Sequence, residues 1–432
     1  MRILHTSDWH LGQHFMGRSR QREHAALLQW ITQQVQAHDV DAVIIAGDIF
    51  DTAAPPSYAR ELYHQLIASL HATGTALLVL GGNHDSVSVL GESQPLLHHL
   101  NTTVIAHTGA PEQHVVVLPR RTAAGEPYAP GCIVCALPFI RARDVQTSLP
   151  GQSMQDKQQG LLDAIRTTYA NVYAVAQARQ TQLQHEYGVR VSIVATGHLT
   201  TLGTSRTESV REIYVGTLDA FPTDAFPPAD YIALGHIHQP QQVGSARHIQ
   251  YSGSPLALGF DELGQRKQVL LVDLNAEGLQ DLTALPVPVW QPMASVQGTL
   301  QSLPAQLQAL AHTADKAQPT WLEITVQQDD YLPDLAARVE ALVQDLPLQV
   351  LRIRRQRAAS RSTLHSTHGE SLQELDPLQV FERRLALEEL PPPLHDALHT
   401  RYRSVLEAVQ HSVPVQSASQ DPASAATTGV QP

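Results

Sequence analysis

Short apolar runs recur along the first 290 residues of this sequence, separated by helical patterns. Each run is brief and rich in leucine or β-branched residues, which is typical of a strand buried within a sheet. The expected strands are Arg2–His5, Ala42–Ala46, Ala76–Leu80, Cys132–Leu137, Val191–Thr196, Tyr231–Leu234 and Gln268–Leu274. Strands that alternate with helices predict one large α/β unit over residues 1–290.

The segments between these runs predict amphipathic helices. Apolar residues recur at helical spacing along Glu23–Ala37 and Tyr58–Leu70, with Ser57 as the expected N-cap of the second helix. Gln155–Tyr187 predicts a long polar helix that ends at Gly188.

Further units are expected beyond this region. Prolines at 286, 288 and 292 predict a boundary. Residues 295–360 predict a small separate α/β unit, with strands at Trp321–Val326 and Leu348–Arg354 and a helical stripe between them. Residues 371–411 predict a helical hairpin broken by three prolines at 391–393, and residues 413–432 predict a disordered tail.

Composition excludes several classes of protein. The 432 residues are 43% hydrophobic, which excludes disorder throughout, collagen and disulfide scaffolds. No apolar window of ~20 residues predicts a membrane span, and the N-terminal residues predict a strand and not a secretory signal. Two cysteines favour a reducing compartment, the cytoplasm. The net charge of −12 argues against a non-specific nucleic-acid coat protein, although not against an enzyme that meets phosphate through metals.

Five small motifs carry the chemistry, and most of them directly follow an expected strand. They are Asp8-x-His10, Gly47-Asp48-x-x-Asp51, Gly82-Asn83-His84-Asp85, Gly197-His198 and Gly235-His236-x-His238. Ligands bind beyond the carboxyl ends of strands in open α/β sheets, and glycine permits the sharp turns needed there. Each motif alone is compatible with an ordinary turn or capping residue. Their occurrence together, in order and at strand ends, favours one shared site.

The residue types suit a pair of divalent cations. Carboxylates supply negative charge, neutral imidazoles supply nitrogen, and the amide of Asn83 supplies an uncharged oxygen. A carboxylate can bridge two metals ~3.5–4 Å apart, the spacing used for phosphoryl displacement. Mixed histidine and carboxylate ligands fit Mn²⁺, Fe²⁺ or Zn²⁺ better than Mg²⁺.

The sequence resembles the calcineurin-like metallophosphoesterase superfamily and, within it, the SbcD family of bacterial nuclease subunits. The resemblance covers about residues 1–410. It is carried by His5–Gly12, Gly47–Asp51, Pro55–Arg60, Ala195–Thr201, Asp230–His238, Tyr251–Pro255 and Arg383–Leu390. It implies a four-layer sandwich of two mixed sheets flanked by helices, with residues 295–360 as a small α/β capping domain and with the helical hairpin added.

The resemblance also implies a role for each motif residue. One metal would be held by Asp8, His10, Asp48 and His238, and the second by Asp48, Asn83, His198 and His236, so Asp48 is the bridge. His84 would be unmetallated and would stabilise the transition state or protonate the leaving oxygen. Asp85 would fix its tautomer, and Asp51 would orient a metal ligand.

The implied activity is that of an Mn²⁺-dependent DNA nuclease, with 3′→5′ double-strand exonuclease and single-strand endonuclease activity that opens hairpins. Two cations would activate water and neutralise the phosphodiester. Two details favour a diester over a monoester: Thr52 stands where many phosphatases of this superfamily have arginine, and Asp85 stands where they have glutamate. The implied partners are DNA and an SbcC-like coiled-coil ATPase, in a complex that contains a homodimer of this chain. The implied setting is DNA replication, recombination and repair at the nucleoid.

Some interpretations stay open. A cluster of five arginines could bind the DNA backbone or form a solvated face: Arg352, Arg354, Arg355, Arg357 and Arg361. The helical pair could dock on the ATPase or pack on its own domain. Cys132 and Cys135 are expected to be core residues on opposite faces of a strand, not a zinc or redox motif. The alternative functions are a stand-alone small-molecule phosphodiesterase and a non-catalytic DNA-end scaffold.

Overall fold

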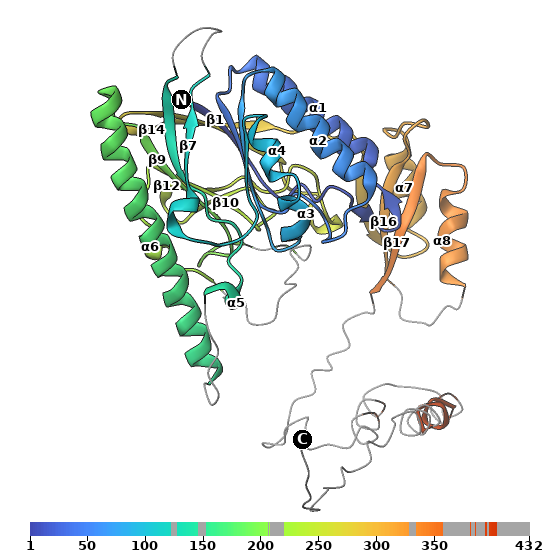
Figure 1. Cartoon of the computed structure of the whole chain (residues 1–432). Helices are drawn as coiled ribbons and strands as arrows, with labels where there is room; N and C mark the ends of the chain where they lie inside the picture. The colour runs from blue at the N-terminus through green and yellow to red at the C-terminus, as the bar shows by residue number, and fades with distance from the viewer. Residues whose placement is uncertain are drawn as a thin grey trace, which may run out of the picture. The chain divides into compact units, whose positions relative to one another are not determined.

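The structure is a computed structural model. It describes residues 1–121, 128–145, 153–205, 207, 220–327, 334–356, 381, 385, 394 and 397–403. The chain divides into two compact units, Met1–Gln356 and Arg357–Pro432, and Figure 1 shows the elements of the first. No described helix is long and apolar enough to cross a membrane.

Two six-stranded mixed sheets form the centre of the first unit. The first has the order β14 (Gly278–Pro286), β13 (Gln268–Asn275), β1 (Arg2–Thr6), β4 (Ala42–Ala46), β5 (Ala76–Leu80) and β6 (Thr102–Ile105). The second has the order β11 (Gln241–Val243), β12 (Ala246–Tyr251), β10 (Tyr231–Gly235), β9 (Ser192–His198), β8 (Pro130–Cys135) and β7 (Val115–Pro119). All seven expected strands are therefore present, and the bounds of β4 and β5 are as expected.

Helices cover the outer faces of both sheets. The larger ones are α1 (Gln21–Ala37), α2 (Ser57–Ala72) and α6 (Met154–Tyr187). Shorter ones are α3 (Val87–Gly91), α4 (Gln94–His98) and α5 (Ala142–Val145), with single turns at Pro111–His114 (η1), Thr223–Ala225 (η2) and Phe260–Glu262 (η3). Figure 1 shows α6 and the pair α1–α2 on opposite sides of the sheets. This arrangement is the expected four-layer sandwich.

The alternation of side chains along each strand builds these layers. In β4, Val43 and Ile45 pack against α1 and α2, whereas Ile44 packs between the two sheets. In β8, Cys132 lies between the sheets and Cys135 lies on the side covered by α6. Both thiols are free and buried, so the prediction that they are core residues on opposite faces is confirmed.

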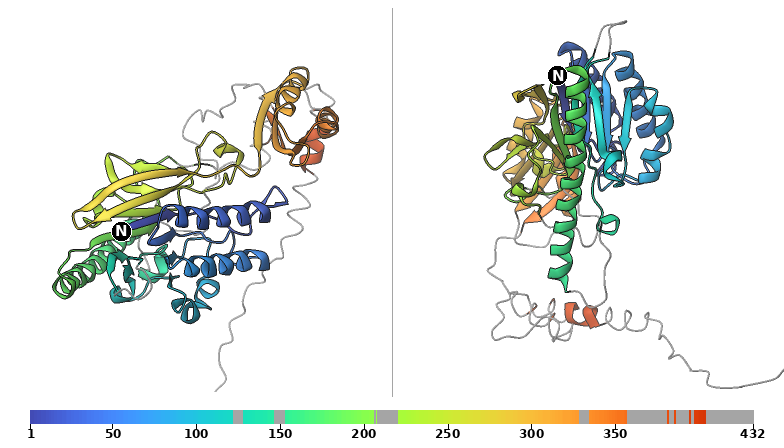
Figure 2. Two further views of the ribbon diagram at one scale, coloured as in Figure 1. Left: turned by 90° about the horizontal axis from the view of Figure 1, so that it is seen from above. Right: turned by 60° about the vertical axis from the view of Figure 1, so that its left-hand side comes forward.

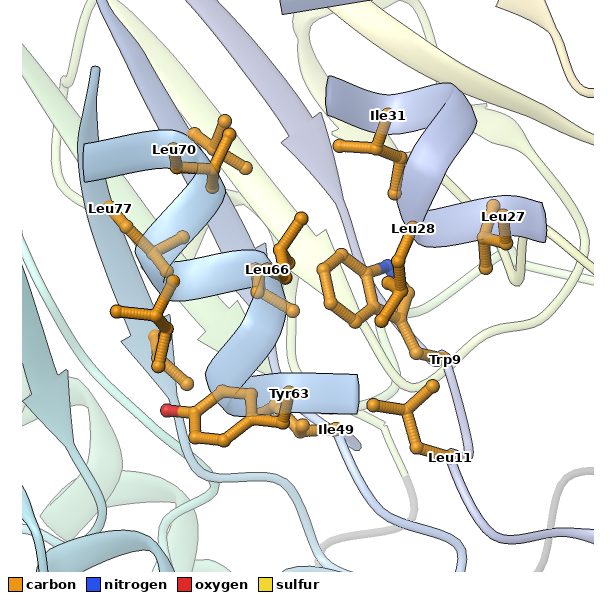
Figure 3. Packing of buried hydrophobic residues seen from close by; sticks show 14 of the residues in the cluster. Trp9, Leu11, Leu27, Leu28, Ile31, Ile49, Tyr63, Leu66, Leu70 and Leu77 are labelled. Carbon is orange, nitrogen blue, oxygen red and sulfur yellow. The ribbon is translucent and has the colours of Figure 1, made fainter. Parts of the chain in front are cut away.

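Trp9 anchors the layer between the first sheet and its helices. Its side chain is fully buried, and its indole N–H donates to Thr6 Oγ1 over 2.8 Å. Figure 3 shows it packed among residues of α1 and α2, including Leu28 and Leu66. Because Trp9 lies between Asp8 and His10, this packing also fixes the backbone that carries two expected ligands.

Two helix boundaries follow from local chemistry. The long helix α6 ends where expected, because Gly188 adopts the left-handed conformation with φ of 73°. The prediction that Ser57 caps α2 is wrong: the capping position is Pro56, whose extended backbone starts the helix without a side-chain hydrogen bond. Ser57 is the first helical residue.

The small cap is a three-stranded parallel sheet with two helices. Its elements are β15 (Met293–Gly298), α7 (Leu303–Ala311), β16 (Thr320–Gln327), α8 (Leu335–Val343) and β17 (Leu348–Gln356). Leu322, Ile324 and Val326 face the helices, as expected, and Figure 2 shows α7 and α8 beside this sheet. The strand β15 begins before residue 295, and the sequence pattern did not reveal it or α7.

The opposite face of the cap sheet packs on the sandwich. Trp321 stacks on Phe15 with ring centroids 5.6 Å apart, and Phe15 packs edge-on against Phe260. Phe15 belongs to the two-stranded hairpin β2 (His14–Phe15) and β3 (Arg18–Ser19). This aromatic contact joins the cap to the segment that follows the first metal motif.

In the second unit, the described residues are helical, and the rings of Phe381 and Tyr402 stack with centroids 3.9 Å apart. These two residues come from the two predicted helices of the 371–411 hairpin. The remainder of that hairpin and the tail at 413–432 lie outside the described residues.

Candidate metal centre

The seven predicted metal ligands lie at the carboxyl ends of five strands. Asp8 and His10 follow β1, Asp48 follows β4, Asn83 follows β5, His198 ends β9, and His236 and His238 follow β10. The strands β1, β4 and β5 are parallel neighbours in one sheet, and β9 and β10 are parallel neighbours in the other. The carboxyl-terminal edges of the two sheets lie against each other, as shown by a hydrogen bond of 3.0 Å from the backbone N–H of His236 to Asp8 Oδ1. All seven side chains are buried.

Four of these residues have a backbone that side chains rarely adopt. The φ angles of Asp8, His10, Asp48 and His236 are 55°, 49°, 51° and 91°. Such conformations cost ~1–3 kcal/mol each and persist only where the surroundings enforce them. Here the first two loops are joined by main-chain hydrogen bonds, from Asp8 N–H to Gly47 O (3.0 Å) and from Trp9 N–H to Asp48 O (2.9 Å).

Glycine is required where the two sheets approach. A Cβ on Gly47, whose φ is 93°, would lie 2.1 Å from Nδ1 of His198. A Cβ on Gly235 would lie 1.9 Å from the carbonyl oxygen of Ala46. The glycines of the motifs are therefore spacers that let the ligands converge.

The ligand atoms form two groups that share one neighbourhood. Atoms of Asp8, His10 and His238 lie within 4.8 Å of one another, and so do atoms of Asp48, His198 and His236. Asp48 Oδ2 lies 3.2 Å from Nε2 of His198 and 3.7 Å from Nε2 of His10, so it reaches both groups.

Asn83 belongs to the second group. Its Oδ1 lies 2.9 Å from Nε2 of His198 and 3.1 Å from Nδ1 of His236. The two groups in space thus contain the residues that the family resemblance assigns to two metals, and that assignment stays a prediction.

The donor set fits divalent cations. Nε2 of His10 is buried without a hydrogen-bond partner among the described residues. A nitrogen that binds a metal ion is expected to show this arrangement in the absence of the ion. Two carboxylates, four imidazoles and one amide oxygen converge within a buried volume. Uncompensated buried carboxylates are costly, and a bound cation offsets that cost.

Electrostatics within the site are dominated by Asp48. Burial by itself would raise its pKa, but the facing imidazoles of His198, His10 and His84 hold the pKa well below its usual range. Burial lowers the pKa of His198, and the carboxylate of Asp48 outweighs this effect and raises it. The carboxylate of Asp48 is thus stabilised in its ionised form, and it favours positive charge on the groups that face it.

Outer hydrogen bonds fix which ring nitrogen faces the centre. Nδ1 of His198 donates to the carbonyl of Ala46 over 2.8 Å, which directs Nε2 inward. Nδ1 of His10 lies 3.2 Å from Asp51 Oδ1, so Asp51 is placed to orient this predicted ligand. Nδ1 of His238 lies 3.0 Å from Glu262 Oε1.

His84 stands at the edge of this centre. Its Nδ1 lies 2.7 Å from the main-chain oxygen of Asp51, which accepts the N–H and leaves Nε2 for other partners. An open cleft of about 160 Å³ is lined by His84 together with His10, Asp51 and His238. A nitrogen of His84 also lies within 4.8 Å of atoms of His10 and Asp48, so distance alone does not separate it from the ligands.

The expected role of Asp85 is wrong. Its carboxylate accepts three backbone N–H groups, from Ile49 (3.1 Å), Phe50 (2.9 Å) and Gly82 (2.8 Å). Burial and the nearby Asp48 raise its pKa to about 6. Asp85 thus ties the second motif to the third, and the carbonyl of Asp51 fixes the His84 tautomer.

Two side chains near the centre, Glu262 and Lys267, were missed by sequence reasoning, and a third, Arg352, was expected only as part of an arginine cluster. Glu262 bridges His238 and the buried Lys267, whose Nζ is 2.6 Å from Glu262 Oε2. Arg352 of β17 lines the same cleft as His84. Glu262 and Lys267 belong to no motif, and no sequence signal could have linked them to a histidine more than 20 residues away.

The geometry and the comparisons define the class of protein. Residues 1–240 match the model of the calcineurin-like phosphoesterase family, and the chain belongs to this family, whose members are metal-dependent phosphoesterases. Residues 289–389 match a second family model, described as the type 5 capsule protein repressor C-terminal domain.

Within that class, the relatives are the SbcD subunits of SbcCD nucleases, and the chain belongs to their family. The SbcD subunit of the Escherichia coli K12 nuclease is 47% identical over 410 residues, which cover 95% of this chain and 98% of that protein. The SbcD subunit of Rhodobacter capsulatus is 33% identical, and the match covers 81% of this chain and 86% of that protein. Among solved structures, a β-glucosidase from Exiguobacterium marinum matches over 82% of this chain and 89% of its own, with 10% identity and a TM-score of only 0.23.

Proposed function

We propose that this chain is the metal-dependent DNA nuclease subunit of an SbcCD-like complex. The observation that supports this most is the convergence of seven ligand side chains from positions 8 to 238 into two neighbouring groups. Relatives at 47% and 33% identity are named as nuclease subunits. The proposed substrate bond is the DNA phosphodiester, and the proposed setting is cytoplasmic DNA replication, recombination and repair.

In this proposal, Asp8, His10, Asp48 and His238 hold one divalent cation, and Asp48, Asn83, His198 and His236 hold the other. When bound, the two cations activate water and neutralise phosphate charge. The four imidazoles favour Mn²⁺ over Mg²⁺.

The chain's own residues supply orientation and a proton. Because its Nδ1–H is held by Asp51 O, an imidazolium at His84 presents its Nε2–H to the cleft. That proton stabilises charge on the phosphate oxygens or passes to the leaving oxygen. Asp51 and Glu262 hold the rings of His10 and His238, so these ligands do not rotate when substrate enters.

The finer activities are part of the proposal. They are 3′→5′ exonuclease activity on double strands and endonuclease activity on single strands and hairpins. The proposed partner is an SbcC-like ATPase, bound by the 371–411 hairpin, with two copies of this chain in each complex. ATP dependence then comes from that partner, because the sequence contains no Gly-x-x-x-x-Gly-Lys-Ser/Thr loop.

The test is cleavage of an end-labelled hairpin DNA in the presence of Mn²⁺, with and without the ATPase partner. The wild-type chain cleaves it, and Asp48→Ala, which lacks the bridging carboxylate, does not. Calorimetry on Asp48→Ala is expected to show loss of Mn²⁺ binding. Hydrolysis of a bis-aryl phosphate without DNA cleavage, even with the partner present, would contradict the proposal and favour a small-molecule phosphodiesterase.

A further inference from the structure

One arginine of the cap reaches the cleft of the metal centre. Arg352 lies on β17 and lines this cleft together with His10, His84 and His238. Asp51 and Asp261 also line it, and Arg352 is the only arginine or lysine that does so among the described residues. A permanent positive charge therefore lines the same cleft as His84 and two predicted ligand histidines.

Arg352 is held in place and is not a mobile surface side chain. Its Nε forms an ion pair with the buried carboxylate of Glu323 on β16. Its guanidinium lies over the ring of Phe260, 5.5 Å from the centroid. The side chain is 29% exposed. The contact with Glu323 uses Nε, so the two terminal nitrogens remain as a donor pair for an anion.

A break in strand register aims this residue at the cleft. Val350 pairs with Leu322 and faces the cap helices, so simple alternation would place residue 352 on the helix side and residue 353 on the cleft side. The register shifts there, and Arg352 pairs with Glu323 while Ile353 packs with the helices. The extra residue is Leu351, which packs against the sandwich. Bulges of this kind redirect side chains beside active sites.

The net charge of the whole chain favours such a contact. The net charge is −12, and nucleic-acid backbones are repelled unless local cations bind their phosphates. The phosphate that is cleaved would be met by the two metals and His84. A cation on the cap side of the opening is placed for the next phosphate of the strand.

We propose that Arg352, positioned by Glu323 and by the bulge at Leu351, binds the DNA phosphate that neighbours the cleaved one. The cap then binds the DNA strand beside the cleaved bond and favours DNA over small phosphodiesters as substrate. This inference rests on the proposed nuclease function and adds the residue that distinguishes a polymer from a single phosphodiester.

The experiment compares two substrates on the full-length chain with Mn²⁺. Arg352→Ala is expected to raise the KM for a single-stranded oligonucleotide roughly tenfold, as for loss of one charge-assisted hydrogen bond. Hydrolysis of bis-p-nitrophenyl phosphate, which has no neighbouring phosphate, is expected to stay within about twofold. Glu323→Gln, which removes the positioning carboxylate, is expected to give a smaller rise in the same KM.

A binding measurement separates phosphate contact from other causes. In a His84→Ala background, where cleavage is expected to be at least 100-fold slower, fluorescence anisotropy with labelled single strands gives the affinity for DNA as a function of salt concentration. The slope of the logarithm of the binding constant against the logarithm of the salt concentration is then measured. Adding Arg352→Ala is expected to make this slope less steep by about 0.7, the value for one lost phosphate contact with a single strand.

Arg338→Ala is the matched control. Arg338 lies on α8 of the same cap, is 53% exposed and pairs with Asp334, so its loss should change neither readout. An unchanged KM for DNA in Arg352→Ala, or an equal loss on both substrates, overturns the inference. Wild-type protein that hydrolyses the bis-aryl diester but not DNA would instead refute the nuclease function and this inference with it.

Discussion

His84 is the residue for which the geometry makes the clearest chemical prediction. Its tautomer is set by a main-chain carbonyl, and its link to Asp48 is a hydrogen bond from its backbone N–H, which does not involve the imidazole. We expect His84→Ala to lose at least 100-fold in DNA cleavage, in line with loss of a general acid. Mn²⁺ binding, measured by calorimetry, should remain. Normal turnover by the purified variant would refute the assigned role, and loss of metal would show that His84 is itself a ligand.

Glu262 illustrates how a single buried carboxylate supports a ligand. Burial raises its pKa, but hydrogen bonds and charge from His238 and Lys267 hold it well below its usual range. Glu262→Gln leaves the buried ammonium of Lys267 without its closest carboxylate. Breaking a buried ion pair in this way lowers the free energy of unfolding by ~3–5 kcal/mol. Urea unfolding measures this loss.

The double variant Glu262→Gln/Lys267→Met is the control for that measurement. It also removes the unpaired ammonium of residue 267, so it should recover part of the lost stability. A single variant as stable as wild type would show that the pair contributes little.

Among the elements, β10 and β4 belong to different sheets and meet at a glycine. We expect Gly235→Ala to destabilise the fold by about 1–3 kcal/mol or more, because its Cβ would lie 1.9 Å from the oxygen of Ala46 and 2.9 Å from Nδ1 of His198. Thermal unfolding without Mn²⁺ measures the loss of stability. The additional stabilisation by Mn²⁺ measures metal binding, which we expect to be weaker because His198 is displaced. Gly264→Ala, where a Cβ meets nothing within 4 Å, should leave both unchanged. Equal behaviour of the two variants would contradict the close approach.

The elements also show what the sequence could and could not predict. Buried strands such as Ala42–Ala46 are apolar throughout, so their pattern is unambiguous. The edge strand β15 is largely half-buried or exposed along Met293–Gly298, and its mixed composition does not stand out. The bulge at Leu351 depends on pairing between strands, and local periodicity does not encode it.

The metal centre was predictable for a related reason. Its predicted ligands lie at or just after the ends of buried strands, so recognising the strands places these residues at one edge of the sheets. The residue that supports His238 was not predictable, because Glu262 reaches the centre from η3, which follows no motif. Arg352 was expected only as one of five clustered arginines, and its place in the cleft depends on the strand register of β17. The role of Asp85 was misjudged because a sequence shows that it is adjacent to His84 but not that its carboxylate points to three backbone N–H groups.

At the scale of the whole molecule, two buried histidines outside the predicted ligand set predict how stability depends on pH. Burial lowers the pKa of both His5 and His24 to about 3, whereas an unfolded histidine titrates near 6.5. Between these values the unfolded chain binds more protons than the folded one, so stability falls as pH drops below about 6.5. The loss per histidine from pH 6.5 to pH 5 is at most about 2 kcal/mol.

His24 offers a clean test of this dependence. Neither of its ring nitrogens has a hydrogen-bond partner among the described residues, so His24→Leu removes a titrating group without breaking a described bond. Urea unfolding of metal-free protein at pH 7 and pH 5 should show a smaller loss of stability in the variant than in wild type. Because both proteins keep His5 and the ligand histidines, the difference between the two losses belongs to His24 alone. Identical losses would show that His24 is already charged in the fold, with a counter-charge that offsets its burial.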